Sequence, residues 1–314
     1  MKQEFIELTG IIPEEMAGKR LDQVLAKLFP EHSRERLKGW VLSGKCLIDG
    51  EQWRPKDKVS GGEQVELEAQ VMNVTDWEPE SIPLDILYED DDLLIINKPA
   101  DLVVHPAAGN RTGTLVNALL HHCPDLKLIP RAGVVHRLDK DTTGLMVVAK
   151  TLAAHTNLVE QLQARTVSRT YEAVVWGLFL AGGTIEKPIG RHPRERIKMA
   201  VVTSGKPAIT HFRVLEKFSQ NTHIQVQLET GRTHQIRVHM SDAKHPLVGD
   251  KTYGGRMRLP ANASEACREL LQSFPRQALH AKKLGFVHPS TQKEVFWEAP
   301  LPKDMAQLLD VLRE

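Results

Sequence analysis

A run of acidic residues divides this chain into two parts. Residues 76–92 contain eight Asp and Glu, two Pro and no Lys or Arg. The run has no hydrophobic periodicity, so it offers no face that could be buried in a core. Basic residues outnumber acidic ones by ten to six in residues 19–58 and by thirty to nineteen in residues 93–314. We therefore predict a small domain over 1–75, an acidic linker over 76–92 and a larger domain over 93–314.

The composition is that of a globular protein in a reducing compartment. The 314 residues are 41% hydrophobic, which suffices for a sizeable core, and the net charge is +1. No run approaches the roughly 18 apolar residues of a membrane helix, and the first residues lack the apolar core of a secretory signal. The three cysteines (Cys46, Cys123 and Cys267) form no metal or disulfide pattern. We predict a cytoplasmic protein without a membrane partner. Its basic stretches are either solvated faces or a surface for a polyanion.

The first domain shows a short helix–helix–strand pattern. Apolar residues at helical spacing predict a helix over 21–28, and Ser33 can cap a second helix that carries the apolar residues of 37–42. A strand follows at 46–48 and runs into an Asp-Gly turn, and alternation over 65–69 predicts another strand. The basic residues on or beside the two helices are Arg20, Lys27, Arg34, Arg36 and Lys38.

The larger domain alternates short strands with a few helices. Strands are predicted at 93–96, 171–175 and 224–228, and helices over 152–162, with Thr151 as the cap, and over 233–241. This order is not a regular strand–helix–strand repeat. The sequence therefore predicts an α+β fold whose larger domain has a mixed, largely antiparallel sheet with surrounding helices.

Three polar blocks stand out from the predicted core segments: 96–106, 136–144 and 228–239. In the second block Asp139 lies between cationic neighbours, in a loop before the apolar strand 145–149. Cations can hold an acid in its ionised form, which suits a nucleophile. The ordinary alternative is an Asp that caps a turn.

The third block places two arginines, Arg232 and Arg237, after a glycine turn at the start of a helix. Backbone amides and guanidinium groups at such a place can bind phosphate or orient a carboxylate. A plain basic helix start is the alternative. Phosphate-binding glycine loops, zinc-binding His-Glu-x-x-His motifs and serine nucleophile elbows are absent from the sequence. The sequence therefore predicts catalysis without a metal or another cofactor.

The three blocks together resemble the RluA-type pseudouridine synthases. His-Arg-Leu-Asp-Lys-Asp-Thr-Thr-Gly at 136–144 is similar to the family signature, and 97–106 and 229–239 resemble two further blocks in the same order. Residues 18–70 are similar to the S4 RNA-binding domain that many members carry. Within the family, the resemblance is closest to the branch that modifies large-subunit ribosomal RNA.

This resemblance implies isomerisation of uridine to pseudouridine in RNA: the base is detached from C1′, rotated and rejoined through C5. Asp139 matches the catalytic aspartate, Tyr171 the tyrosine that stacks on the flipped base and Arg232 the basic residue that pairs with the aspartate. Arg137 matches the arginine that fills the vacated position in the RNA, and Leu228 would supply an apolar wall. Whether the aspartate attacks C1′ or deprotonates C2′ stays open.

Other basic groups of the motifs are expected to support the loop and the RNA. His136, His105 and Lys98 match such positions. In the first domain, the resemblance to S4 domains assigns RNA contacts to Arg20, Arg34, Arg36 and Lys38. The implied partner of this monomer is 23S ribosomal RNA, at the helix 69 stem-loop, as free RNA or within a large-subunit particle.

Three other functions remain open from the sequence. A glycoside hydrolase could use Asp139 and Asp141 as a carboxylate pair, although aromatic residues for sugar stacking make up only 5% of the chain. A non-catalytic S4-type RNA-binding protein would not require Asp139. A pseudouridine synthase could also act on another RNA.

Overall fold

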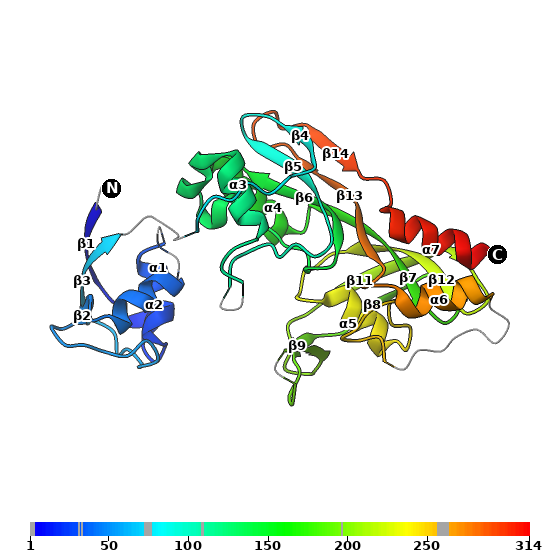
Figure 1. The fold of residues 1–314 in the computed structure, drawn as a ribbon. Helices are drawn as coiled ribbons and strands as arrows, with labels where there is room; N and C mark the ends of the chain where they lie inside the picture. Colours follow the sequence, from blue (N-terminus) through cyan, green and yellow to red (C-terminus); the bar gives the residue numbers. More distant parts are fainter. Residues whose placement is uncertain are drawn as a thin grey trace. The chain divides into compact units, whose positions relative to one another are not determined.

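The structure is a computed structural model that divides into two compact units, residues 1–75 and 76–314 (Figure 1). Each unit has its own hydrophobic core. The residues that the structure describes are 4–30, 32, 34–71, 77–107, 110–195, 197–255 and 264–314.

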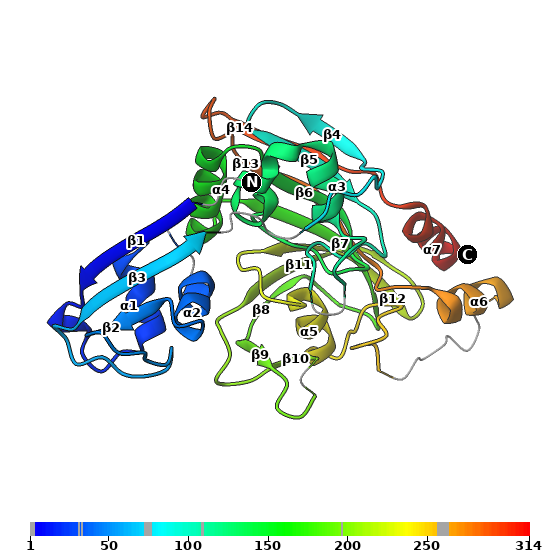
Figure 2. The same ribbon diagram turned by 60° about the vertical axis from the view of Figure 1, so that its left-hand side comes forward.

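The first unit is a small three-stranded sheet with two helices on one side (Figure 2). Its antiparallel strands lie in the order β1-β3-β2. The elements are β1 (Glu4–Ile11), the 3-10 helix η1 (Glu14–Met16), α1 (Leu21–Leu28), α2 (Arg34–Leu42), β2 (Cys46–Ile48) and β3 (Gln64–Val71). Both predicted helices and both predicted strands are confirmed, whereas β1 was not predicted.

The predicted Asp-Gly turn after β2 is also confirmed. Asp49 and Gly50 both have positive φ, as a two-residue hairpin turn requires, and Ile48 and Glu51 exchange backbone hydrogen bonds across it. The predicted helix cap Ser33 lies outside the described residues.

The second unit is built on one large mixed sheet. Among the described residues, nine strands join in the order β4-β5-β6-β13-β7-β12-β11-β8, with β14 also paired to β13. Only the β6–β13 pair is parallel, so the predicted, largely antiparallel sheet is confirmed. The strands are β4 (Ile86–Glu89), β5 (Leu93–Lys98), β6 (Thr143–Ala149), β7 (Ser168–Trp176), β8 (Gly183–Glu186), β11 (Ile209–Lys217), β12 (Asn221–Leu228), β13 (Leu279–Val287) and β14 (Glu294–Glu298), with β9 (Ile189–Arg191) and β10 (Met199–Val201) as a separate pair.

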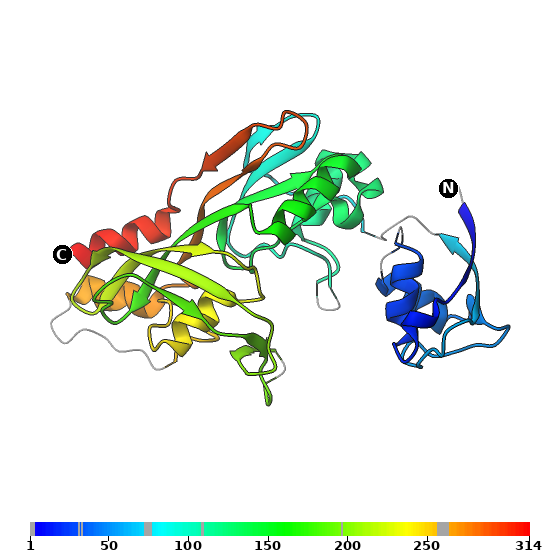
Figure 3. The same ribbon diagram turned by 180° about the vertical axis from the view of Figure 1, so that it is seen from behind.

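Helices cover both faces of this sheet. Alternate residues of β5, β6 and β7 point to opposite faces, as the strand period of two dictates. One face packs against α3 (Leu115–His122) and α5 (Gln235–Asp242), and it also carries the 3-10 helices η2 (Pro124–Leu128) and η3 (Pro130–Gly133). The other face packs against α4 (Leu152–Ala164), α6 (Glu265–Ser273) and α7 (Lys303–Arg313); Figure 3 shows the last two in orange and red. The predicted cap of α4 is confirmed, since the Thr151 hydroxyl accepts a hydrogen bond from the backbone N–H of Ala154.

Most of the predicted acidic linker belongs to the second unit. Strand β4 pairs with β5 at the edge of the sheet, so residues 77–92 are not a linker. The acidic side chains meet partners of the same unit: Glu89 pairs with Lys150 at 2.8 Å, and Asp90 lies 2.8 Å from the ring of His288. The prediction of a solvated linker used only the charges within the segment. It missed these partners because they lie far away in the sequence.

None of the helices in the described part of the chain is long and apolar enough to cross a membrane.

Candidate active site

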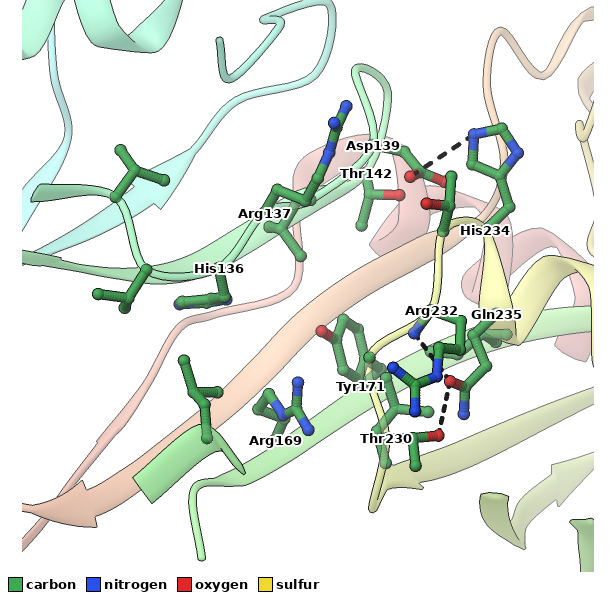
Figure 4. A pocket seen from close by; sticks show the side chains of 18 of the residues that line it. His136, Arg137, Asp139, Thr142, Arg169, Tyr171, Thr230, Arg232, His234 and Gln235 are labelled. Atoms are coloured by element: carbon green, nitrogen blue, oxygen red, sulfur yellow. Dashed lines mark hydrogen bonds and ion pairs between the residues drawn. The ribbon is translucent and has the colours of Figure 1, made fainter. Parts of the chain in front are cut away.

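A cavity of about 840 Å³ opens on the face of the large sheet that carries α5 (Figure 4). This volume suits a nucleotide-sized ligand. The 136–144 and 228–239 blocks meet in its wall, together with the first residues of β7. The sequence-predicted residues that line it are His105, His136, Arg137, Asp139, Tyr171, Leu228 and Arg232.

The loop that carries Asp139 is fixed by the strand that follows it. β6 begins at Thr143 and runs parallel to β13 at its first residues. A side chain on Gly144 would place its Cβ only 2.3 Å from the carbonyl oxygen of Ala281 on β13, and the residue has a φ of +111°. Glycine at the end of the signature block is therefore required for β6 to pack directly against β13 beside the Asp139 loop.

Asp139 is held by an arginine that reaches it from α5. Arg237 donates from Nη1 to Asp139 at 2.8 Å, and from Nε and Nη2 to both oxygens of Asp250 at 2.7 and 2.9 Å. The Asp250 side chain is fully buried, whereas that of Asp139 keeps 19% of its surface exposed. The bidentate contact to Asp250 fixes the plane of the guanidinium and leaves one N–H directed at Asp139.

Electrostatics favours the ionised forms of Asp250 and Arg237. Burial alone would raise the pKa of Asp250, but hydrogen bonds and charge from Arg237 hold that pKa below its usual value. Burial opposes the charge on Arg237 in turn, yet its two carboxylate partners raise its pKa above the usual value. The guanidinium also lies 5.0 Å from the ring centroid of Tyr253. A permanent cation therefore sits beside the Asp139 carboxylate.

The predicted pair between Arg232 and Asp139 is wrong. Arg232 is partly exposed, and its Nε donates to the carbonyl oxygen of Pro207 at 3.0 Å. The chain turns sharply after Arg232, with His234 in the left-handed region at φ 56°, before α5 begins. This turn places Arg232 at the cavity wall away from Asp139 and brings Arg237, five residues on, to the carboxylate.

Two further side chains define the start of α5. The oxygen of the Gln235 side chain accepts from the hydroxyl of Thr230 and the backbone N–H of Arg232, which ties the turn to the helix. The ring of His234 contacts the hydroxyl of Tyr253 at 2.8 Å and lies 3.8 Å from Asp139. Burial lowers the pKa of His234, although the Asp139 charge opposes this shift. His234, Gln235 and Asp250 are site residues that the sequence analysis did not identify.

The apolar part of the cavity comes from the sheet. Tyr171 on β7 and Leu228 at the end of β12 are almost fully buried, and both belong to the hydrophobic core beneath the cavity. Burial raises the pKa of Tyr171, so the phenol stays neutral. Arg137 is exposed at the cavity wall, where its side chain is free to meet a ligand.

Two motif histidines are neutral parts of the cavity wall. His136 accepts at Nε2 from the backbone N–H of Val147 at 3.1 Å, and desolvation lowers its pKa to about 3. Burial lowers the pKa of His105 to about 4, and its ring contacts Trp77 edge-on. Neither carries the positive charge that would attract RNA phosphates at neutral pH.

Lys98 does not line the cavity, so contact with RNA was the wrong half of its predicted role, whereas its predicted support of the loop is confirmed. The side chain is buried, and Nζ donates to the carbonyl oxygens of Pro99, Leu102 and Lys140 at 2.7–2.9 Å. The ammonium therefore fastens the Asp139 loop to the end of β5. Burial lowers the pKa of Lys98 to about 7, even though Asp141 and Asp139 raise it in part.

Replacing Lys98 with Met is expected to destabilise the protein by about 2–4 kcal/mol, because three carbonyls, of which that of Leu102 is buried, lose their donor. The loss should be larger at pH 9 than at pH 7. Between the folded pKa of about 7 and the ordinary value of 10.5, the unfolded chain binds more protons, so the parent gains stability as the pH rises. Denaturant unfolding at both pH values measures this. Lys217→Met, at an exposed lysine, is the control, and an equal loss at both pH values would contradict the assignment.

The predicted cations of the first unit form a different cluster. Arg20 and Arg34 both contact the buried carboxylate of Asp22, at 3.0 and 2.7 Å, while about half of each arginine side chain stays exposed. Asp22 thus holds two guanidinium groups at the surface beside α1 and α2. Lys38 lies partly buried on α2, and the side chain of Arg36 is outside the described residues.

Comparison with known proteins assigns both units. Residues 92–242 match the family described as RNA pseudouridylate synthase, and residues 19–65 match the S4 domain. The chain belongs to the RNA pseudouridylate synthase family.

Similarity to two bacterial relatives extends over nearly the whole chain. The ribosomal large subunit pseudouridine synthase D of Pseudomonas aeruginosa is 58% identical over 311 residues, which are 99% of this chain and 97% of that protein. The protein of the same name from Escherichia coli K12 is 55% identical over 98% of this chain and 95% of its own length. The structure of human RNA pseudouridylate synthase domain-containing protein 4 has 28% identity and a TM-score of 0.57, and it covers 73% of this chain and 92% of its own.

Proposed function

We propose that this protein isomerises uridine to pseudouridine in large-subunit ribosomal RNA, with Asp139 as the catalytic carboxylate. The observation that carries the proposal is the Asp139–Arg237 pair in the wall of a nucleotide-sized cavity. The names of the two bacterial relatives support large-subunit ribosomal RNA as the substrate. Asp141 does not line the cavity, so the geometry does not favour the carboxylate pair of a glycoside hydrolase.

The chemistry begins with a uridine that leaves its stack, at a cost of a few kcal/mol. In the cavity Tyr171 would stack on the base, and Leu228 would support it from the sheet. Asp139 then either bonds to C1′ or takes a proton from C2′. In both cases the C1′–N1 bond breaks with its electron pair on the base, and C5 later bonds to C1′. Arg137 would fill the space that the base leaves in the RNA.

The first unit would supply affinity rather than chemistry. Arg20 and Arg34 present half-exposed guanidinium groups that Asp22 orients. Such groups can neutralise phosphates without reading the sequence. We propose that the protein acts in the cytoplasm as a monomer on the helix 69 stem-loop of 23S RNA, free or within a particle.

The direct test is a reaction with separate 23S and 16S transcripts. The purified protein should form pseudouridine in the 23S transcript without an added nucleotide or metal. Chromatography of the digested nucleosides detects the product, and reverse transcription after chemical tagging of pseudouridine locates it. Product outside helix 69, or in 16S RNA at an equal rate, would contradict the proposed site, and no product in either RNA would contradict the activity.

Deleting residues 1–75 is expected to weaken RNA binding and to flatten its dependence on salt. Each lost phosphate contact reduces the slope of log K against log salt by about 0.7–0.9. Turnover at saturating RNA should fall much less, because the cavity lies within the second unit. Filter binding at several salt concentrations and single-turnover rates measure the two effects. An unchanged salt slope would exclude the first unit from binding.

A further inference from the structure

Arg169 is a buried cation without an acidic partner. The residue is only 8% exposed, and its Nε has no hydrogen-bond partner. The Nη2 atom donates a long hydrogen bond of 3.4 Å to the carbonyl oxygen of Glu229. No carboxylate in the described part of the chain lies within ion-pair distance of it. Burying a guanidinium in this way is costly unless a ligand completes its contacts.

The strand places this guanidinium in the cavity beside Tyr171. The two residues are separated by one position on β7, so they share a face of the sheet, and both line the cavity (Figure 4). A Cβ on Gly231 would lie 2.7 Å from Nη1 of Arg169. The glycine of the 228–239 block therefore makes room for the Arg169 side chain.

The position within the cavity indicates which part of an RNA ligand Arg169 meets. Exposed arginines at 131, 137 and 165 also line the cavity, and they suit the phosphates of a strand that remains in solvent. Arg169 is instead buried, next to the tyrosine that would stack on the base. The group that penetrates deepest into this cavity is the flipped base, and uracil presents two carbonyl oxygens as acceptors.

We propose that Arg169 donates a hydrogen bond to a carbonyl oxygen of the flipped uracil and stabilises the base while it is detached. When the C1′–N1 bond breaks, the electron pair stays on the base and its negative charge spreads over N1, O2 and O4. The same electrons form the C5–C1′ bond, after which C5 loses its proton to a base and N1 takes one up. No oxidant or cofactor enters. This inference rests on the proposed function and adds a residue that contacts the substrate.

The test compares Arg169→Met and Arg169→Lys with the parent in single-turnover reactions at saturating RNA. The Met variant should react about 10²- to 10³-fold more slowly, as for other lost oxyanion donors, while RNA affinity changes by less than about tenfold. The Lys variant should recover part of the rate, because the charge remains but the planar fork does not. Arg313→Met removes a surface charge of the same unit and should react normally.

Sulfur-substituted substrates separate contact with the base from a structural role. A stem-loop RNA with 2-thiouridine or 4-thiouridine at the target carries a weaker acceptor at one carbonyl. One of these RNAs should react more slowly with the parent, and this penalty should vanish in the Met variant. Equal penalties in both proteins, or a Met variant that reacts normally but binds weakly, would overturn the inference and indicate a phosphate contact or a structural role. A parent that forms no pseudouridine would refute the proposed function itself.

Discussion

Asp139→Asn is expected to reduce pseudouridine formation by at least about 10³-fold, because the amide has neither the charge nor the basicity that each chemical route requires. RNA affinity should change little, since phosphate contacts dominate binding. The substitution preserves shape, and an amide oxygen can still accept from Arg237 at the position where the carboxylate accepts at 2.8 Å. The variant should therefore fold and bind while it fails to react.

A matched control exists on the surface. Asp101 pairs with Lys140, which lies next to Asp139 in its loop. The Asp101 side chain is 84% exposed and does not line the cavity. Its backbone is in the left-handed region at φ 62°, which Asn tolerates as well as Asp. Asp101→Asn should keep nearly the parent rate. Product formation by Asp139→Asn at anything near that rate would remove Asp139 from the mechanism.

Among the residues that contact Asp139, Arg237 is expected to show the largest losses of stability and turnover when it is replaced with Met. Arg237→Met removes one donor from Asp139 and two from the fully buried Asp250. An uncompensated buried charge costs about 3–5 kcal/mol, so the unfolding free energy should fall by that amount. Turnover at saturating RNA should fall by about 10²- to 10³-fold, because the carboxylate loses the donor that orients it. Arg237→Lys should recover little, since one ammonium cannot hold both carboxylates.

The comparison with Arg232 decides between the two arginines of the block. The side chain of Arg232 donates to the carbonyl oxygen of Pro207 and lies partly exposed at the cavity wall. Arg232→Met should weaken RNA binding and retain most of the saturated rate. Thermal unfolding of each variant and single-turnover rates measure both effects. If Arg232→Met lost turnover and Arg237→Met retained it, the assignment of the ion pair would be reversed.

The sequence predicts the helices and helix caps of this protein better than it predicts which charged side chains pair with one another. The helix over 21–28 and the cap at Thr151 follow from spacing and from one hydroxyl, so both could be found without long-range information. The acidic run over 76–92 could not be interpreted in the same way, since its partners Lys150 and His288 lie far along the chain. Charge patterns describe a segment in isolation, and the fold decides what each charge meets.

The candidate site shows the same limit. The resemblance to the family correctly places Asp139, Tyr171 and Leu228 together, since all three line one cavity. The choice of Arg232 rather than Arg237 failed because the turn before α5 could not be predicted. A partial signal was present: Arg237 lies between Ile236 and Val238 on a short predicted helix, and a buried guanidinium is costly unless it is paired.

The most direct test of the central claim follows the hydrogen on C5. Formation of the C1′–C5 bond expels that hydrogen, so RNA with tritium at C5 of uridine releases tritium to water once for each pseudouridine formed. The parent should release it in an amount equal to the pseudouridine found by chromatography, and Asp139→Asn should release essentially none while binding the same RNA. Release by the Asn variant at the parent rate, or binding without release by the parent, would contradict the account.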